Sequence, residues 1–140
     1  MSDTITLLSA STFSNSATLQ GEKAKGDAYF GANDGLHTIA IQLNDFIGTI
    51  KIQGSLATDP QETDWFDIDL NSGATGVDTT GKVSDATVSS LPYTLAETSM
   101  KSYNATGNFV WLRVDVSNWT GGTISRIEMN RLEQRWRRKQ

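Results

Sequence analysis

LHTIAIQLNDFIGTIKIQGSLATDPQETDWFDI, residues Leu36–Ile68, is the stretch that decides the fold. Its apolar residues recur at every second position in two runs: Ile39, Ile41 and Leu43, then Ile50, Ile52 and Leu56. A period of two is typical of β-strands with one buried face. The residues between the runs, Asn44–Gly48, include the turn formers Asn44, Asp45 and Gly48. The stretch therefore predicts an antiparallel hairpin that leads into a third strand at Trp65–Leu70.

A second strong strand is predicted at Asn108–Ser117, where valine or leucine occupies every even position from Val110 to Val116. After a turn at Asn118–Gly122, Thr123–Asn130 is expected to return as its partner. Weaker strands are expected at Thr4–Ser9, Ala17–Gly21 and Asp27–Ala32. Asn71–Ser90 is expected to be a loop-rich excursion with one or two short strands, Leu91–Tyr93 a fixed turn, and Thr94–Gly107 has no clean period. A connection of this length is unusual in a compact domain, so either part of it is strand or it is a binding loop.

About eight short strands and almost no helix predict an all-β protein, an antiparallel β-sandwich of the jelly-roll kind. A small closed barrel is the alternative, and the number of strands does not separate the two. We expect residues 1–130 to form the sandwich domain. Residues 131–140, RLEQRWRRKQ, are expected to form a basic C-terminal tail or docking segment, which favours helix but is too short to be stable alone.

The charge of the chain is unevenly distributed. The net charge is −4, but the residues up to Ser125 include 6 basic and 14 acidic side chains, and the remainder includes 6 basic and 2 acidic ones. An acidic body repels phosphate, so nucleic acid is a poor candidate partner except through the basic tail. There is no cysteine, and therefore no disulfide or thiolate site. We expect no secretory leader and no membrane contact, because no basic leader or apolar run of about 20 residues is present.

Four segments carry a resemblance to a known class of protein: FIGTIKIQGSL at Phe46–Leu56, DWFDI at Asp64–Ile68, GNFVWLRVDV at Gly107–Val116, and the strand Gly122–Met129. Together they resemble small β-sandwich virion structural proteins of tailed bacteriophages, most of all those of contractile-tailed cyanophages. The shared pattern is F-x-G-T-[IV]-x-[IL]-Q-G-[ST]-L, a short acidic loop, W-F-[DT]-I, and later G-N-[FY]-x-W-[IL]-R-[IV]. Similar strands also occur in carbohydrate-binding and discoidin-like sandwiches.

The resemblance implies a non-enzymatic protein that decorates or reinforces the head, neck or tail of a virion after synthesis in the host cytoplasm. Its partners would be other virion proteins and further copies of itself, and it would need no cofactor. The alternative hypothesis is a carbohydrate-binding module or the receptor-binding tip of a tail fibre, because aromatic side chains also bind sugars.

The candidate partner-binding residues are the cationic and aromatic side chains of the tail together with two tryptophans: Arg131, Arg135, Trp136, Arg137, Arg138, Trp111 and Trp119. Arginine forks pair with carboxylates, and tryptophan fills pockets at protein interfaces. A disordered tail, or a tail that reaches DNA, is the competing hypothesis. Trp111 should lie on a covered outer face, whereas Trp119 is the better candidate for an exposed contact.

Acidic residues crowd the segment after the central hairpin. Asp59, Glu62 and Asp64 are weak candidates for a calcium site, because calcium prefers several carboxylate oxygens. An ordinary solvated turn is the competing interpretation, and no metal is expected. His37, the one histidine, is expected to be a scaffold residue. The sequence shows no triad, no phosphate-binding glycine motif and no acid–base pair beyond these carboxylates, so we do not expect an enzyme.

Overall fold

Three long antiparallel strands form the centre of the computed structural model, which describes residues 2–14, 16–31, 35–71 and 87–132. They are β5 (Leu36–Ser55), β9 (Leu91–Thr106) and β10 (Trp111–Leu132). The shorter strands are β1 (Ser2–Leu8), β2 (Ser11–Thr12), β3 (Leu19–Gln20), β4 (Ala24–Lys25), β6 (Phe66–Asp67), β7 (Leu70–Asn71) and β8 (Thr87–Val88). The helices of the described residues are two 3-10 turns, η1 (Asp27–Phe30) and η2 (Glu62–Asp64). The all-β, antiparallel prediction is confirmed.

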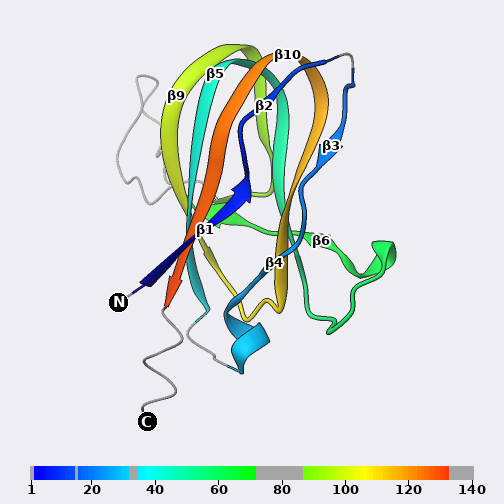
Figure 1. Cartoon of the computed structure of the whole chain (residues 1–140), viewed down its shortest axis with the longest axis vertical. Coiled ribbons are helices and arrows are strands. Elements are labelled where there is room, and N and C mark those ends of the chain that lie inside the picture. Colours follow the sequence, from blue (N-terminus) through cyan, green and yellow to red (C-terminus); the bar gives the residue numbers. More distant parts are fainter. Residues whose placement is uncertain (1, 15, 32–34, 72–86, 133–140) are drawn as a thin grey trace.

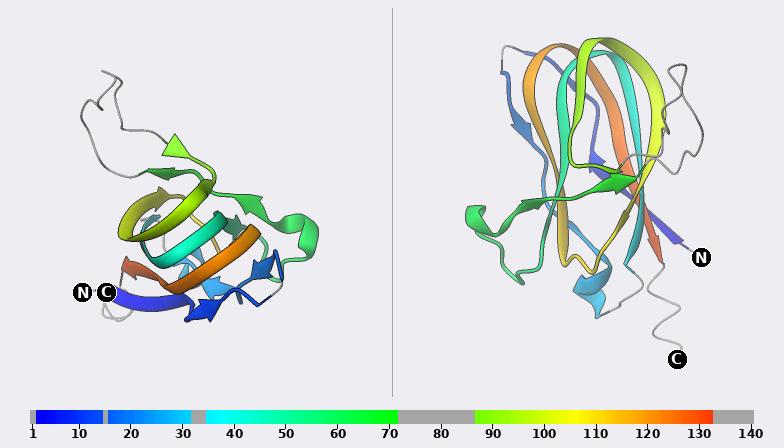
Figure 2. Two further views of the ribbon diagram at one scale, coloured as in Figure 1. Left: turned by 90° about the horizontal axis from the view of Figure 1, so that it is seen from above. Right: turned by 180° about the vertical axis from the view of Figure 1, so that it is seen from behind.

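The described strands belong to one sheet, in the order β1-β10-β5-β9-β7-β8, with β2, β3 and β4 also on β10 and β6 on β5. In Figure 1, β9, β5 and β10 rise on one side, arch over the top of the molecule and descend on the other side. Seen from above in Figure 2, they lie side by side as nested arches. The sheet therefore folds over on itself, and its two halves face each other as layers of a sandwich. No helix among the described residues is long and apolar enough to cross a membrane.

The predicted hairpin is wrong, because β5 is one continuous strand. Its first half, Thr38–Asn44, pairs with the second half of β10, and its second half, Thr49–Ser55, pairs with the first half of β10. The two apolar runs therefore lie in opposite layers instead of side by side. The turn predicted at Asn118–Gly122 is also wrong, since those residues lie inside β10 where it crosses from one layer to the other.

One extra residue at Asp45 lets β5 turn the corner. Side chains at odd positions are buried up to Leu43, and those at even positions are buried from Phe46 onward, with Asn44 and Asp45 both exposed between them. Asp45 has φ 55°, a left-handed conformation typical of such a bulge. The bulge absorbs the extra residue, so both halves of β5 keep their apolar side chains on the inner surface. The Asp45 backbone N–H donates to the Thr98 hydroxyl at 3.0 Å, which ties this corner to β9.

The interior between the layers is apolar and closed. Its fully buried side chains come from both halves of the two longest strands: Ile39, Ile41, Leu43, Phe46, Ile50, Ile52, Leu112, Val114, Val116, Ile124, Ile127 and Met129. Burying a side chain of this size contributes about 1.5–3 kcal/mol, so this set supplies most of the driving force for folding. Leu56, predicted to face inward, is 65% exposed because β5 ends at Ser55. Phe109, predicted to face outward, is buried because it precedes β10.

Three weaker predictions fail on local structure. Asp27–Phe30 is the turn η1 instead of a strand. The segment Trp65–Leu70 divides between β6, which pairs with β5, and β7, which pairs with β8 and β9. The turn predicted at Leu91–Tyr93 is instead the start of β9, whose outward side chains are mostly exposed, so few apolar residues mark this strand in the sequence. Within β9, burial and a hydrogen bond to Tyr103 raise the pKa of Tyr93.

Candidate protein-docking surface

Trp111 is the first residue of β10, and it pairs with Ser55 of β5 on one side and Lys25 of β4 on the other. Its indole Nε1 donates to the carbonyl oxygen of Thr58 at 3.0 Å. The ring of Tyr29 stands edge-on to the indole with 5.0 Å between centroids. The outer side of Trp111 is thus partly covered by the chain after β5 and by η1, as a covered tryptophan was predicted to be.

The turn η1 lies at the lower end of the molecule in Figure 1, and its Tyr29 and Phe30 carry two more rings. Tyr29 is 41% exposed and Phe30 is 36% exposed, with 5.2 Å between their ring centroids. Gly26 allows η1 to lie close against the start of β10, because a Cβ at this position would overlap the Phe109 carbonyl oxygen. The Gly26 N–H donates to the Val110 carbonyl at 2.8 Å, which fixes η1 on the sheet.

Two lysines complete this surface. Lys23 Nζ lies 4.6 Å from the Trp111 ring centroid, and Lys25 Nζ lies 4.6 Å from that of Tyr29. Each such cation–π contact contributes about 0.5–1 kcal/mol at an exposed position. We call Lys23, Lys25, Tyr29, Phe30 and Trp111 the aromatic–lysine patch. It places positive charge and exposed rings together on a body that is otherwise acidic.

Arg113, two residues after Trp111, holds the neighbouring acidic loop against the sheet. Its Nε donates to Gln53 Oε1 at 2.9 Å, and its Nη1 donates to Glu62 Oε2 at 3.0 Å. Its guanidinium carbon lies 4.3 Å from the ring centroid of Trp65. The Glu62 side chain is 71% exposed, so solvent weakens this ion pair, and the stacking and the bond to Gln53 matter more.

The arrangement of this loop does not support the calcium candidates. The carboxylate of Glu62 is directed to Arg113, and Asp64 Oδ2 accepts the backbone N–H of Gln61 at 2.8 Å, which caps η2. Within the described residues, no three His, Asp or Glu side chains are grouped to hold a metal ion. Asp59, Glu62 and Asp64 therefore belong to an ordinary capped turn in this conformation.

The fold of this chain is similar to that of a solved structure. The crystal structure of the SPBc2 prophage-derived protein YomS superposes with a TM-score of 0.53. It shares 11% sequence identity and covers 93% of this chain and 91% of its own. No family model and no curated protein matches the sequence. At this identity the likeness establishes the curled all-β architecture alone.

The prediction that Trp119 is exposed is wrong. Its side chain is 4% exposed, Nε1 donates to the Gly121 carbonyl at 3.0 Å, and the ring lies 5.9 Å from Phe46 and 6.1 Å from Phe13. Asn118, at φ 51°, reverses the alternation of β10 and turns the indole inward. Trp119 is one of the lining residues of a groove of about 330 Å³, and most of the others are serines and threonines. Its ring therefore offers no face on which a sugar could stack.

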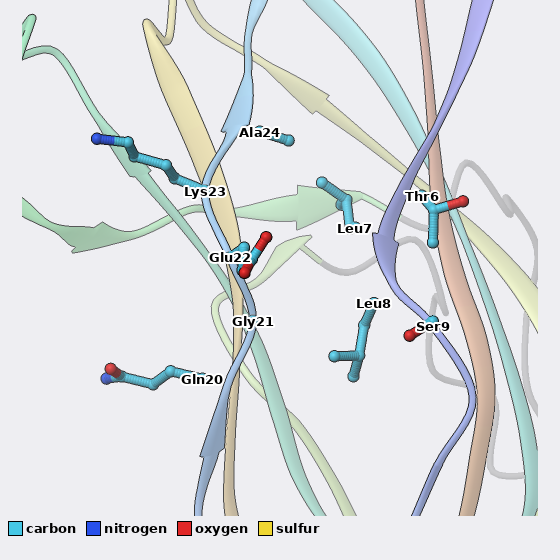
Figure 3. A pocket seen from close by; sticks show the side chains of 9 residues that line it. All are labelled: Thr6, Leu7, Leu8, Ser9, Gln20, Gly21, Glu22, Lys23 and Ala24. Carbon is cyan, nitrogen blue, oxygen red and sulfur yellow. The ribbon is translucent and has the colours of Figure 1, made fainter.

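A second groove, of about 390 Å³, lies where β1 passes the segment from β3 to β4 (Figure 3). Leu7 and Leu8 project into it, whereas Gln20 and Lys23 point away. A Cβ at Gly21 would lie 3.1 Å from the Leu7 carbonyl oxygen, so glycine permits the two edges to approach. Glu22 is the one carboxylate of this groove, which therefore holds no acid–base pair.

His37 is a scaffold residue, as predicted, and it is fully buried. Its Nε2 accepts the Asp27 backbone N–H at 3.2 Å, so Nδ1 carries the proton and donates to the Gly35 carbonyl at 3.1 Å. Asp27 Oδ2 in turn accepts the Gly35 N–H at 3.2 Å. These bonds secure the chain on either side of η1 and so position the aromatic–lysine patch.

Trp111 was predicted from the sequence as a partner-binding residue, but the residues around it were not. The segment EKAKGDAYF, residues 22–30, could have indicated these residues, because two lysines one residue apart precede a Gly-Asp turn and two aromatic residues. Of the predicted tail, β10 includes the backbone of Arg131 and Leu132, which continue the ladder with β1 instead of forming a helix. Arg135, Trp136, Arg137 and Arg138 lie outside the described residues.

Proposed function

We propose that this protein is a non-enzymatic structural component of a bacteriophage virion that docks on other virion proteins through the aromatic–lysine patch. The observation that carries this proposal is the gathering of exposed rings and lysines at one end of the curled sheet. The assignment to a phage is supported by the sequence resemblance to virion proteins and by the fold likeness to a prophage-derived protein.

The chemistry of the patch fits a protein surface with carboxylates. Tryptophan and tyrosine are enriched among the residues that dominate binding at protein interfaces. Tyr29 and Phe30 expose apolar rings that a partner would remove from water, at about 25 cal/mol for each Å² buried. Lys23 and Lys25 would meet acidic side chains at the rim of that contact. The partner we propose is therefore an acidic surface with an apolar pocket on another virion protein.

The basic tail would supply a second contact with the same partner. β10 ends at the lower end of the molecule, the end that carries η1 (Figure 1). A tail that begins there can reach a partner already held by the patch. Arginines in this tail would pair with carboxylates of that partner.

The mechanism is stabilisation by mass action. A protein that binds the assembled particle and not its loose subunits stabilises the particle by RT ln(1 + [L]/Kd). A hundredfold excess over Kd gives about 2.7 kcal/mol for each site. Because a symmetric particle offers many identical sites, a modest stabilisation at each site adds up to a large stabilisation of the whole particle.

Incorporation into particles tests the proposal. The variant Tyr29→Ala/Phe30→Ala should fold but be depleted from purified particles, as measured by quantitative mass spectrometry. Phe66→Ala is the matched control, since Phe66 is an equally exposed ring, at 40%, outside the patch. Truncation after Leu132, which leaves the β1–β10 ladder complete, should also reduce incorporation. Absence of the wild-type protein from particles would refute a virion role, and normal incorporation of the double variant would refute docking through the patch.

The carbohydrate-binding hypothesis relied on an exposed Trp119 to stack on a sugar, and Trp119 is buried. A glycan array still separates the two hypotheses. Saturable sugar binding by the wild-type protein that is lost in Tyr29→Ala would favour the carbohydrate-binding module over protein docking.

A further inference from the structure

His37 connects η1 to the sheet through both nitrogens of its ring. Nε2 accepts the Asp27 backbone N–H at 3.2 Å, and Nδ1 donates to the Gly35 carbonyl oxygen at 3.1 Å. That carbonyl oxygen also accepts the backbone N–H of Gly107, between β9 and β10, at 2.9 Å. One side of the imidazole is therefore anchored on the sheet, and the other side holds the first residue of η1.

The protonation state of the ring decides whether this connection can form. A neutral imidazole has one nitrogen that donates and one that accepts, whereas the imidazolium ion has two donors and no acceptor. In the imidazolium form, the Nε2–H of His37 would face the backbone N–H of Asp27, which is also a donor. Because His37 is fully buried, water does not replace the lost acceptor while η1 stays in place. Proton uptake by the ring and its bond to the Asp27 N–H are thus mutually exclusive.

The groups that face His37 do not remove this conflict. The buried Asp27 carboxylate would attract an imidazolium ion, but its Oδ2 already accepts a backbone N–H at 3.2 Å. To receive the new Nε2–H, this carboxylate would have to take the place of its own backbone N–H, which moves the start of η1. The other neighbours are uncharged: the Phe109 ring, with 5.7 Å between centroids, and Ala105, the cross-strand partner on β9. Asp34 lies outside the described residues.

We propose that His37 is a pH-sensitive latch, which in its neutral form holds η1 on the sheet and on proton uptake releases it. A histidine in water takes up a proton at about pH 6.5. The released form of the protein can bind this proton, whereas the latched form cannot do so while the Asp27 bond stands. Acid therefore shifts the population toward the released form. Above about pH 6.5 the latch is fully engaged, and its contribution to stability is lost as the pH falls.

Release of η1 would act on the aromatic–lysine patch. Tyr29 and Phe30 belong to η1, and the Tyr29 ring lies between the indole of Trp111 and the ammonium group of Lys25 in the chain of contacts that forms the patch. Loss of the latch would separate these groups, so docking through the patch would weaken at acid pH. This consequence rests on the proposed function, whereas the latch itself is tested on the isolated chain without any partner.

NMR spectroscopy of the full-length chain tests the latch directly, because His37 is the one histidine of the sequence and its ring nitrogens give a single set of signals. At pH 7.5 the ring should be neutral, with its proton on Nδ1. Between pH 7.5 and pH 5, ring protonation should coincide with a loss of about tenfold in the hydrogen-exchange protection of the Asp27 and Ala28 amides. The amides of Ile41 and Val114, in the central strands, should keep their protection.

His37→Gln is the matched control, because a glutamine side chain offers an acceptor but does not titrate. Its η1 amides should be equally protected at pH 7.5 and pH 5. His37→Phe has no acceptor, so its η1 amides should be less protected at both pH values.

Four results would overturn the proposal, and the first three come from the wild-type chain alone. They are a ring proton on Nε2 at pH 7.5, a ring that stays neutral down to pH 5, and ring protonation that leaves η1 protected. The fourth is an acid-induced loss of η1 protection that persists in His37→Gln, which would show that another group takes up the proton.

Discussion

Replacement of Gly122 by alanine should destabilise the protein far more than the same change at its neighbour Gly121. Gly122 lies where β10 turns the corner, at φ +82°, and a Cβ there would overlap the Asp45 carbonyl of β5. The two residues with left-handed backbones at this corner, Asp45 of β5 and Gly122 of β10, are thus packed directly against each other. A Cβ at Gly121 would meet no atom within 4 Å, and φ at this residue is not positive, so Gly121 is a matched control one residue away.

The expected loss follows from two separate costs. A left-handed backbone costs an L-residue with a side chain roughly 1–2 kcal/mol. Relief of the overlap requires the two central strands to move apart, and overpacking of this kind costs about 1–3 kcal/mol. The sum of about 2–5 kcal/mol is a large part of a total stability of about 5–15 kcal/mol. Gly121→Ala should stay within about 0.5 kcal/mol of the wild type.

Urea denaturation followed by tryptophan fluorescence measures both variants. With a slope of about 2 kcal/mol/M, the midpoint for Gly122→Ala should fall by about 1–2.5 M, with little change for Gly121→Ala. On the facing strand, Asp45→Asn should be nearly neutral, because Asn tolerates φ 55°, whereas Asp45→Val should be destabilising. Equal midpoints for the two glycine variants would show that the strands do not nest at this corner.

Three further outcomes are expected from the same titration. His37→Phe should lose about 1–3 kcal/mol, because it leaves the buried backbone N–H of Asp27 without its acceptor. Arg113→Met should lose about 1–2 kcal/mol and increase amide hydrogen exchange in the η2 loop, which Arg113 holds through Glu62 and Trp65. Addition of calcium should leave the midpoint unchanged, since the carboxylates of the η2 loop are not grouped around a common point; a raised midpoint would restore the calcium hypothesis.

Local patterning predicted the strands whose inward face is apolar and failed where a strand is polar or irregular. Ile50, Ile52 and Val114 alternate with polar residues, and each is fully buried. β9 escaped prediction because it exposes most of its outward side chains at an edge, where no alternation is required. The exposure of Trp119 was mispredicted because Asn118 adopts φ 51°. This left-handed conformation is uncommon for residues other than glycine, so the local sequence does not predict it.

The candidate surface shows the same division. Trp111 could be identified as a residue on a covered outer face from its position opposite the apolar set of β10. The residues that complete the aromatic–lysine patch come from η1 and β4, far from Trp111 in the sequence. They meet because β4 pairs with β10 at Trp111, and no local pattern encodes that pairing.

The sequence by itself determined that the chain is all-β, because alternating β-branched residues can bury one face only as extended strands. It also determined most of the side chains with which β5 and β10 line the interior, such as Ile41, Ile52 and Val114. Only the tertiary structure decided how the chain turns between the runs. Asn44–Gly48 and Asn118–Gly122 are equally suited to a hairpin turn or to a bulged corner. The corner results because β5 and β10 carry their irregular residues at the same height, with Gly121 opposite Ile47, so the two strands can arch together while their ladders continue on both sides. That match is a property of two segments some 70 residues apart, and neither segment alone contains it.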